Sequence, residues 1–278
     1  MVKLLKICLT VLLLGGACFL SGCNVDLLGL FGSTDLDKRL KDRDNFKFLK
    51  AGDLKPSPSF GDEYSFIVLS DTHIENGKAW GLEKLENIIK GSNNEIKFAV
   101  IAGDITQNGA AKDIKKFIAI ARSLEVPCYP VIGNHDIYFG NWTEWKNLIG
   151  STRYKIDGGG TTLFILDTAN AFFGKDQLDW LEKEIKKTKG HVFVFTHCNL
   201  SMIGFDEVQQ LTDTRERARI VSILRNRCDA MFTGHLHKRL ISEEGNVKYV
   251  SLNGYVERRA YCLVSVKKTG VSYKFVDF

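Results

Sequence analysis

The sequence has few of the features that mark disulfide-rich, nucleic-acid-binding or disordered proteins. Seven cysteines in 278 residues are too few for a disulfide scaffold, and no Cys-x-x-Cys pair indicates a zinc knuckle. The net charge of +5 arises from 38 basic and 33 acidic residues without a basic block, so binding to a nucleic-acid scaffold is not expected. A hydrophobic share of 44% excludes a disordered or collagen-like chain.

Two common catalytic motifs are also missing from the sequence. It contains no Gly-x-Ser-x-Gly around a nucleophilic serine, and no Walker-type glycine loop followed by lysine and a hydroxyl residue. The chemistry therefore has to come from other residues.

The beginning of the chain has the order of a secretory signal. Lys3 and Lys6 form a short positive region, and the apolar run 7–20 and small residues follow. This run is shorter than the roughly 20 residues that a helix needs to cross a bilayer. Residues 20–23 resemble the lipobox of bacterial lipoproteins, which implies cleavage before Cys23 and acylation of that cysteine. We therefore expect an exported lipoprotein of the bacterial cell envelope, with an uncleaved or differently cleaved signal and an incidental cysteine as the alternative.

These observations divide the chain into a signal peptide (1–22), a tether that starts at Cys23 (23–61) and a folded domain (62–278). The tether is rich in glycine, proline and serine around a charged stretch, 35–50, with loosely spaced apolar residues. That stretch is either a short helix docked on the domain or a solvated linker. The four cysteines of the domain are interpreted as buried thiols whose pairing the sequence leaves open: Cys128, Cys198, Cys228 and Cys262.

Short apolar runs alternate with amphipathic stretches through the domain. The runs predict buried strands at 65–69, 98–102, 127–132, 163–166, 192–195 and 230–232. The amphipathic stretches predict helices at 80–90, 111–124, 177–187 and 213–227. Asp213 is the expected N-cap of the last helix, with Glu216 as its capping partner. A strand-rich end, 247–275, completes an α/β or α+β pattern with a mixed sheet.

Five of the predicted strands lead into polar side chains that can bind metal ions. These side chains are Asp71 and His73; Asp104; Asn134, His135 and Asp136; His197; and His235 and His237. Five of the six histidines lie in these segments. Each residue alone could cap a turn or be a hydrogen-bonded core histidine. Because ligands of open α/β sheets bind beyond the carboxyl ends of the strands, we expect the set to form one site.

Imidazole and carboxylate ligands together favour zinc, iron or manganese over calcium. Two such ions about 3.5–4 Å apart need a bridging ligand, and they acidify water enough to provide hydroxide near neutral pH. The sequence therefore predicts a site for two divalent metal ions, whose identity it leaves open.

In this order, the motifs resemble those of the calcineurin-like metallophosphoesterases. The resemblance implies a four-layer α-β-β-α sandwich of two mixed sheets flanked by helices. It also implies that one metal ion is held by Asp71, His73 and His237, the other by Asn134, His197 and His235, and that Asp104 bridges them. His135 would donate to the phosphate and protonate the leaving oxygen, and Asp136 would fix its ring. The expected reaction is hydrolysis of a phosphomonoester or phosphodiester by a hydroxide that bridges the metal ions.

Other positions indicate which branch of this superfamily the sequence resembles. Gln107 and Asn108 stand where protein Ser/Thr phosphatases have aspartate and arginine, and Gln107 also replaces the metal-binding tyrosine of purple acid phosphatases. Residues 103–109 and 177–181 are more similar to the small single-domain branch that includes cyclic-nucleotide phosphodiesterases. Two other functions stay open: a non-catalytic surface-binding lipoprotein that kept the fold, and a lipid-directed pyrophosphohydrolase, which the anchor suggests. The substrate and the oligomeric state remain undetermined at this level.

Overall fold

The computed structural model describes residues 33–42, 46–48, 60–93, 95–200 and 213–278. The predicted signal peptide, Cys23 and the first part of the tether lie outside the described residues. In the part that is described, no helix is both long and apolar enough to cross a bilayer.

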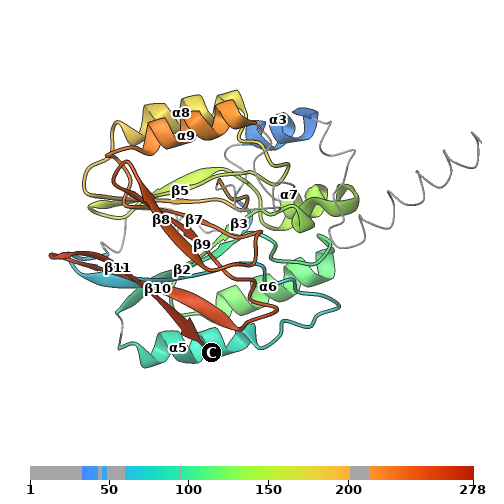
Figure 1. Cartoon of the computed structure of the whole chain (residues 1–278). Helices are drawn as coiled ribbons and strands as arrows, with labels where there is room; N and C mark the ends of the chain where they lie inside the picture. Colours follow the sequence, from blue (N-terminus) through green and yellow to red (C-terminus); the bar gives the residue numbers. More distant parts are fainter. Residues whose placement is uncertain (1–32, 43–45, 49–59, 94, 201–212) are drawn as a thin grey trace, which may run out of the picture.

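Two mixed sheets form the centre of the molecule (Figure 1). The first contains, in spatial order, β11 (Gly270–Asp277), β10 (Ala260–Lys267), β1 (Tyr64–Leu69), β2 (Ile96–Ala102) and β3 (Cys128–Val131). The second contains β4 (Tyr154–Asp157), β5 (Thr161–Ile165), β6 (His191–Phe195), β7 (Ala230–Thr233), β9 (Val247–Ser251) and β8 (Leu240–Glu244). Strands β1, β2 and β3 are parallel, as are β5, β6, β7 and β9. The carboxyl ends within each parallel set therefore share one edge of their sheet.

Helices cover both outer faces of the paired sheets (Figure 1). Helices α5 (Leu85–Gly91) and α6 (Ala111–Ser123) lie outside the first sheet, and α8 (Lys175–Ile185) and α9 (Thr214–Leu224) lie outside the second. The remaining short elements are η1 (Leu82–Lys84), η2 (His135–Gly140) and α7 (Trp142–Leu148). The four-layer sandwich expected from the family resemblance is confirmed.

Aromatic side chains fill the space between the sheets. Phe66 of β1 lies 4.9 Å from Phe193, 6.2 Å from Phe195 and 6.1 Å from Phe232, measured between ring centroids. All four side chains are fully buried. Burial of each contributes about 1.5–3 kcal/mol, so this contact holds the two sheets, and the loops at their ends, in a fixed relation.

A helix from the predicted tether packs against the segment between β5 and α8. In α3 (Ser33–Lys41), Leu36 and Leu40 are buried, and the Arg39 side chain is 1% exposed. Arg39 donates to both carboxylate oxygens of Asp167, at 2.7 and 3.0 Å, and to Asn170 Oδ1 at 2.7 Å. Of the two alternatives for this stretch, residues 33–41 therefore form the docked helix.

The expected capping box of α9 is only half present. Asp213 Oδ1 accepts hydrogen bonds from the backbone N–H groups of Arg215 and Glu216, as an N-cap does. The Glu216 carboxylate accepts instead from the N–H groups of Phe173 and Gly174, at 2.6 and 2.9 Å. These N–H groups precede α8 and have no partner within that helix, so they compete for the carboxylate. The four cysteines of the domain are buried and free.

Candidate metal centre

The candidate site lies where loops from the two sheets meet. Backbone hydrogen bonds join these loops: Asp71 N–H donates to Gly103 O at 3.0 Å, His73 N–H to Asp104 O at 3.0 Å, and Gly234 N–H to His197 O at 2.9 Å. The loops that follow β1 and β2 are thus fixed to each other, as are those that follow β6 and β7. The positions of the side chains are set by the framework of both sheets.

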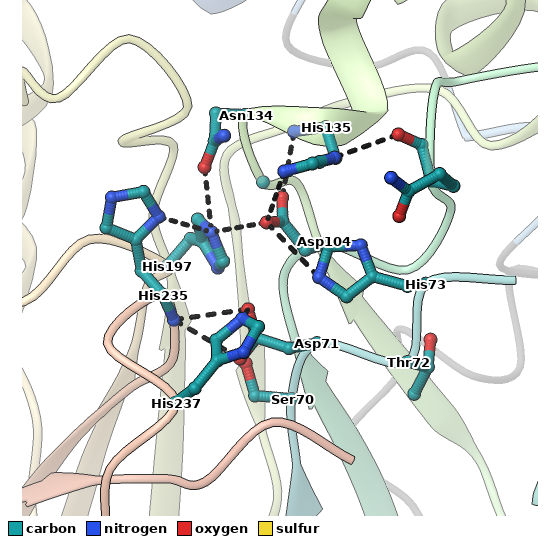
Figure 2. A network of polar contacts seen from close by, with 12 residues as sticks. Ser70, Asp71, Thr72, His73, Asp104, Asn134, His135, His197, His235 and His237 are labelled. Atoms are coloured by element: carbon teal, nitrogen blue, oxygen red, sulfur yellow. Dashed lines mark hydrogen bonds and ion pairs between the residues drawn. The ribbon is translucent and has the colours of Figure 1, made fainter. Parts of the chain in front are cut away.

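The seven predicted ligands converge there, as Figure 2 shows. Donor atoms lie within 4.8 Å of one another in three groups: Asp71, His73 and His237; His73, Asp104 and His135; and Asp104, His197 and His235. The remaining predicted ligand, Asn134, has its Oδ1 atom 3.0 Å from His197 Nε2. Asp71 and His237 are separated by 166 positions in the sequence, yet Asp71 Oδ1 lies 3.1 Å from His237 Nε2.

Asp104 occupies the middle of this arrangement (Figure 2). Its Oδ2 atom lies 3.2 Å from His197 Nε2 and 3.9 Å from the Nε2 atoms of both His73 and His135. Its Oδ1 atom accepts the His135 backbone N–H at 2.8 Å. One carboxylate therefore faces members of both ligand groups, which is the geometry that a bridging ligand requires.

The backbone at the site is unusual. Five of the seven predicted ligands have a left-handed conformation, with φ of 56° at Asp71, 40° at His73, 48° at Asp104, 69° at His235 and 53° at His237. This region costs an L-residue about 1–2 kcal/mol. At Gly103, with φ of 90°, a Cβ atom would also overlap the His197 ring. Strained backbone of this kind gathers at functional sites, where the rest of the fold holds it in place.

Charge at the site is divided between carboxylates and imidazoles. Burial opposes ionisation of both His197 and Asp104, but their contact overcomes it: the pKa of His197 is raised to about 9, and that of Asp104 is held well below its ordinary value. Burial and the nearby His197 lower the pKa of His235 to about 4. Burial also lowers the pKa of His73. The carboxylate of Asp104 is therefore ionised and the imidazoles of His73 and His235 are neutral, which are the forms that bind metal ions. His197 holds a proton, which a metal ion bound to its ring would displace.

His73 provides a test of whether metal ions fit this site. Both of its ring nitrogens are buried, and neither has a hydrogen-bond partner in the described part of the chain. A buried polar group without a partner costs about 1–3 kcal/mol, and a cation beside the ring would remove that cost. With two buried carboxylates, the other imidazoles and the Asn134 oxygen, the donors fit two divalent ions of the zinc, iron or manganese type.

Asp136 does not lie where it was expected. The expectation that it fixes the His135 ring does not match the geometry, because His135 Nδ1 lies 2.8 Å from the carbonyl oxygen of Gln107. The buried Asp136 carboxylate accepts instead from the N–H groups of Gly133, Ile105 and Thr106, at 3.0, 3.2 and 2.8 Å. Successive side chains of a 3₁₀ helix point about 120° apart, so neighbours at the start of η2 face different surroundings. Asp136 joins two loops of the site.

Two other residues of the site were missed by the sequence analysis. The Tyr138 hydroxyl accepts from Asn134 Nδ2 at 3.0 Å, which leaves the amide oxygen of Asn134 facing His197. Glu257 Oε1 lies 2.6 Å from Nδ1 of His237. Neither residue is part of a metal-binding motif. Only a distance in the fold could have identified Glu257, which lies 20 positions after its partner.

Comparison with known proteins shows which family this chain resembles in sequence and in fold. The model of the calcineurin-like phosphoesterases matches residues 64–239, which include all seven predicted ligands. A protein named as a probable cyclic nucleotide phosphodiesterase from Fibrobacter succinogenes is 28% identical over 198 residues, which cover 66% of this chain and 77% of that protein. A second protein, named as a probable glycerophosphodiester phosphodiesterase from Arcobacter nitrofigilis, is 27% identical over 62% of this chain and 71% of that protein. The crystal structure of a dimetal phosphatase from Danio rerio, 14% identical, shares the fold with a TM-score of 0.59 over 77% of this chain and 99% of that one.

Proposed function

The chain belongs to the calcineurin-like phosphoesterase family and is a hydrolase of phosphoester bonds, and we propose that it cleaves a phosphodiester with two divalent metal ions held around Asp104. The observation that carries this proposal is the position of Asp104 between two groups of buried donors. Asp71, His73 and His237 would hold one ion, and Asn134, His197 and His235 the other. A protein that only kept the fold has no need for this strained set, which disfavours a non-catalytic role.

The side chains around the ions have separate tasks. When bound, the two ions supply Lewis acidity, which neutralises phosphoryl charge and makes water a stronger acid. The Gln107 carbonyl can only accept, so His135 Nδ1 donates to it and Nε2 faces Asp104. His135 Nε2 is the atom that we assign to hold a proton beside the phosphoryl group and deliver it to the leaving oxygen. Asp136 keeps the loops after β2 and β3 together and thereby positions His135.

A phosphodiester is the favoured substrate class because two relatives that each cover more than three fifths of this chain are named as phosphodiesterases. Gln107 and Asn108 stand where protein Ser/Thr phosphatases have aspartate and arginine, so a phosphoprotein is disfavoured as the substrate. The site would act in the bacterial cell envelope if Cys23 carries a lipid anchor, which the lipobox-like residues 20–23 support. That anchor also keeps phospholipid-derived esters among the substrates to be tested.

A metal-reconstitution assay tests this proposal. Metal-free protein is loaded with Mn²⁺, Fe²⁺ or Zn²⁺ and offered a chromogenic diester, the corresponding monoester, cyclic nucleotides and glycerophosphodiesters. We expect metal-dependent hydrolysis with higher kcat/KM for diesters. Preference for monoesters would contradict the substrate class, and no hydrolysis by protein that binds both ions would contradict the catalytic function. Membrane fractionation of a Cys23→Ser variant tests the anchor, because a variant that stays bound after a salt wash does not depend on acylation.

A further inference from the structure

We propose that Glu257 is a positioning residue for the first metal ion, acting through the ring of His237. This inference rests on the proposed function, because it concerns the same metal centre. Glu257 lies outside residues 64–239, the part of the chain that the family model matches. The contact therefore joins His237, inside the matched residues, to a residue of the C-terminal part of this chain.

The loop that carries Glu257 is attached to the first ligand strand. After β9, Tyr255 N–H donates to Ser70 O at 2.9 Å, and Val256 N–H donates to Asp71 O at 3.2 Å. The loop thus hydrogen-bonds to the backbone of Asp71, a proposed ligand of the first ion. This attachment fixes the main chain immediately before Glu257.

The loop is closed on itself by further hydrogen bonds. Asn253 Nδ2 donates to Arg258 O at 2.8 Å, and Arg258 N–H donates to Gly254 O at 3.0 Å. At position 254, a Cβ atom would overlap both the Glu257 carboxylate and the His237 ring. Glycine at this position is therefore what lets the carboxylate and the ring approach each other.

The contact itself sets which nitrogen of His237 faces the metal centre. A carboxylate can only accept, so Nδ1 carries the hydrogen and donates to Glu257 Oε1 at 2.6 Å. The other ring nitrogen, Nε2, faces Asp71 Oδ1 at 3.1 Å, on the side of the metal centre (Figure 2). A hydrogen bond of this kind orients a metal-binding histidine and makes it a stronger ligand. Glu257 and the loop backbone together hold His237 and Asp71 in the relation that the first ion requires.

Metal titration of Glu257 variants tests this role. Calorimetric titration of metal-free protein with Mn²⁺ gives the dissociation constant of each binding step, and Asp71→Asn and Asn134→Ala variants identify the step that belongs to each position. We expect Glu257→Ala to weaken the Asp71-dependent step by about 10–100-fold and to leave the other step unchanged. Glu257→Gln, whose amide oxygen still accepts from Nδ1, should lose less. Glu86→Gln, at a partly exposed glutamate that pairs with Lys90 away from the site, is the matched control and should bind as the unmodified protein does.

Three results would overturn the inference: unchanged binding in Glu257→Ala, equal weakening of both steps with a lower unfolding temperature, or equal losses in the Ala and Gln variants. The last would assign the effect to charge and not to ring orientation. The titration also separates this inference from the proposed function. Protein that binds two ions but hydrolyses no phosphoester disproves the function and leaves the role of Glu257 measurable, whereas protein that binds no Mn²⁺ disproves both.

Discussion

Removal of the Arg39 side chain should destabilise the whole domain, although this residue lies in the predicted tether. Arg39 and Asp167 are 1% and 0% exposed, and three hydrogen bonds of 2.7–3.0 Å join the guanidinium to Asp167 and Asn170. In Arg39→Ala the Asp167 carboxylate stays buried without its cation. Loss of one partner of a buried ion pair costs about 3–5 kcal/mol. For a domain of this size, that corresponds to a fall in Tm of roughly 6–20 °C.

Thermal unfolding measured by circular dichroism gives the comparison. Glu86→Ala, which breaks an exposed pair with Lys90, is the control and should change stability by less than about 1 kcal/mol. The double variant Arg39→Met, Asp167→Leu removes both charges and should recover much of the lost stability, because a buried pair can be replaced by apolar groups at little cost. An Arg39→Ala variant with the Tm of the unmodified protein would refute the reasoning and show that α3 is not part of the folding unit.

Three further predictions concern the metal centre. Asp104→Ala should lose most bound metal and nearly all hydrolysis, measured by metal analysis and a chromogenic diester; a metal-loaded, active variant would contradict a bridging role. His135→Ala should keep its metal but lose about 10²–10⁴-fold in turnover, most clearly with a poor leaving group. Unchanged turnover on that substrate would show that His135 donates no proton. Chelation of the metal should lower Tm, since ions that bind only the folded state stabilise it by about 2.7 kcal/mol at one hundred times Kd; equal Tm with and without metal would contradict the fit of the donors.

The convergence of the proposed metal ligands could be predicted from the sequence because these residues follow strands. Each stands within a few residues of a short apolar run, as Asp71 and Asp104 do after β1 and β2. Parallel strands bring their carboxyl ends to one edge, so order along the chain becomes proximity in space. The fold class followed from the same alternation of strands and helices. The four-layer arrangement itself came from the family resemblance, since periodicity does not show how two sheets face each other.

The partners of the ligands could not be predicted, because they depend on distances and side-chain directions. The His135 ring meets a backbone carbonyl, that of Gln107, and carbonyls have no sequence signature. The family resemblance implied Asp136 as its partner, but the local helical geometry turns Asp136 away from the ring. Glu257, in a loop, lies 20 positions from its partner His237. Arg39, in a helix, lies 128 positions from its partner Asp167, and no motif marks either element. Edge strand β8 was missed for a related reason, because its exposed side chains show no apolar pattern.

The strained backbone explains why so much of this chain supports one small site. Left-handed residues such as His73 and Asp104 hold their conformation only if surrounding contacts determine it more strongly than local preference does. The backbone hydrogen bonds between the loops after β1 and β2, and the attachment of residues 255 and 256 to Ser70 and Asp71, supply such contacts. The buried ring of His73 has no hydrogen-bond partner among the described residues, as expected of a side chain that those contacts keep ready for a metal ion. We infer that the rigid loops and the buried His73 ring belong to one arrangement. In it, folding bears a local cost so that the proposed metal ligands are in place before a metal ion binds.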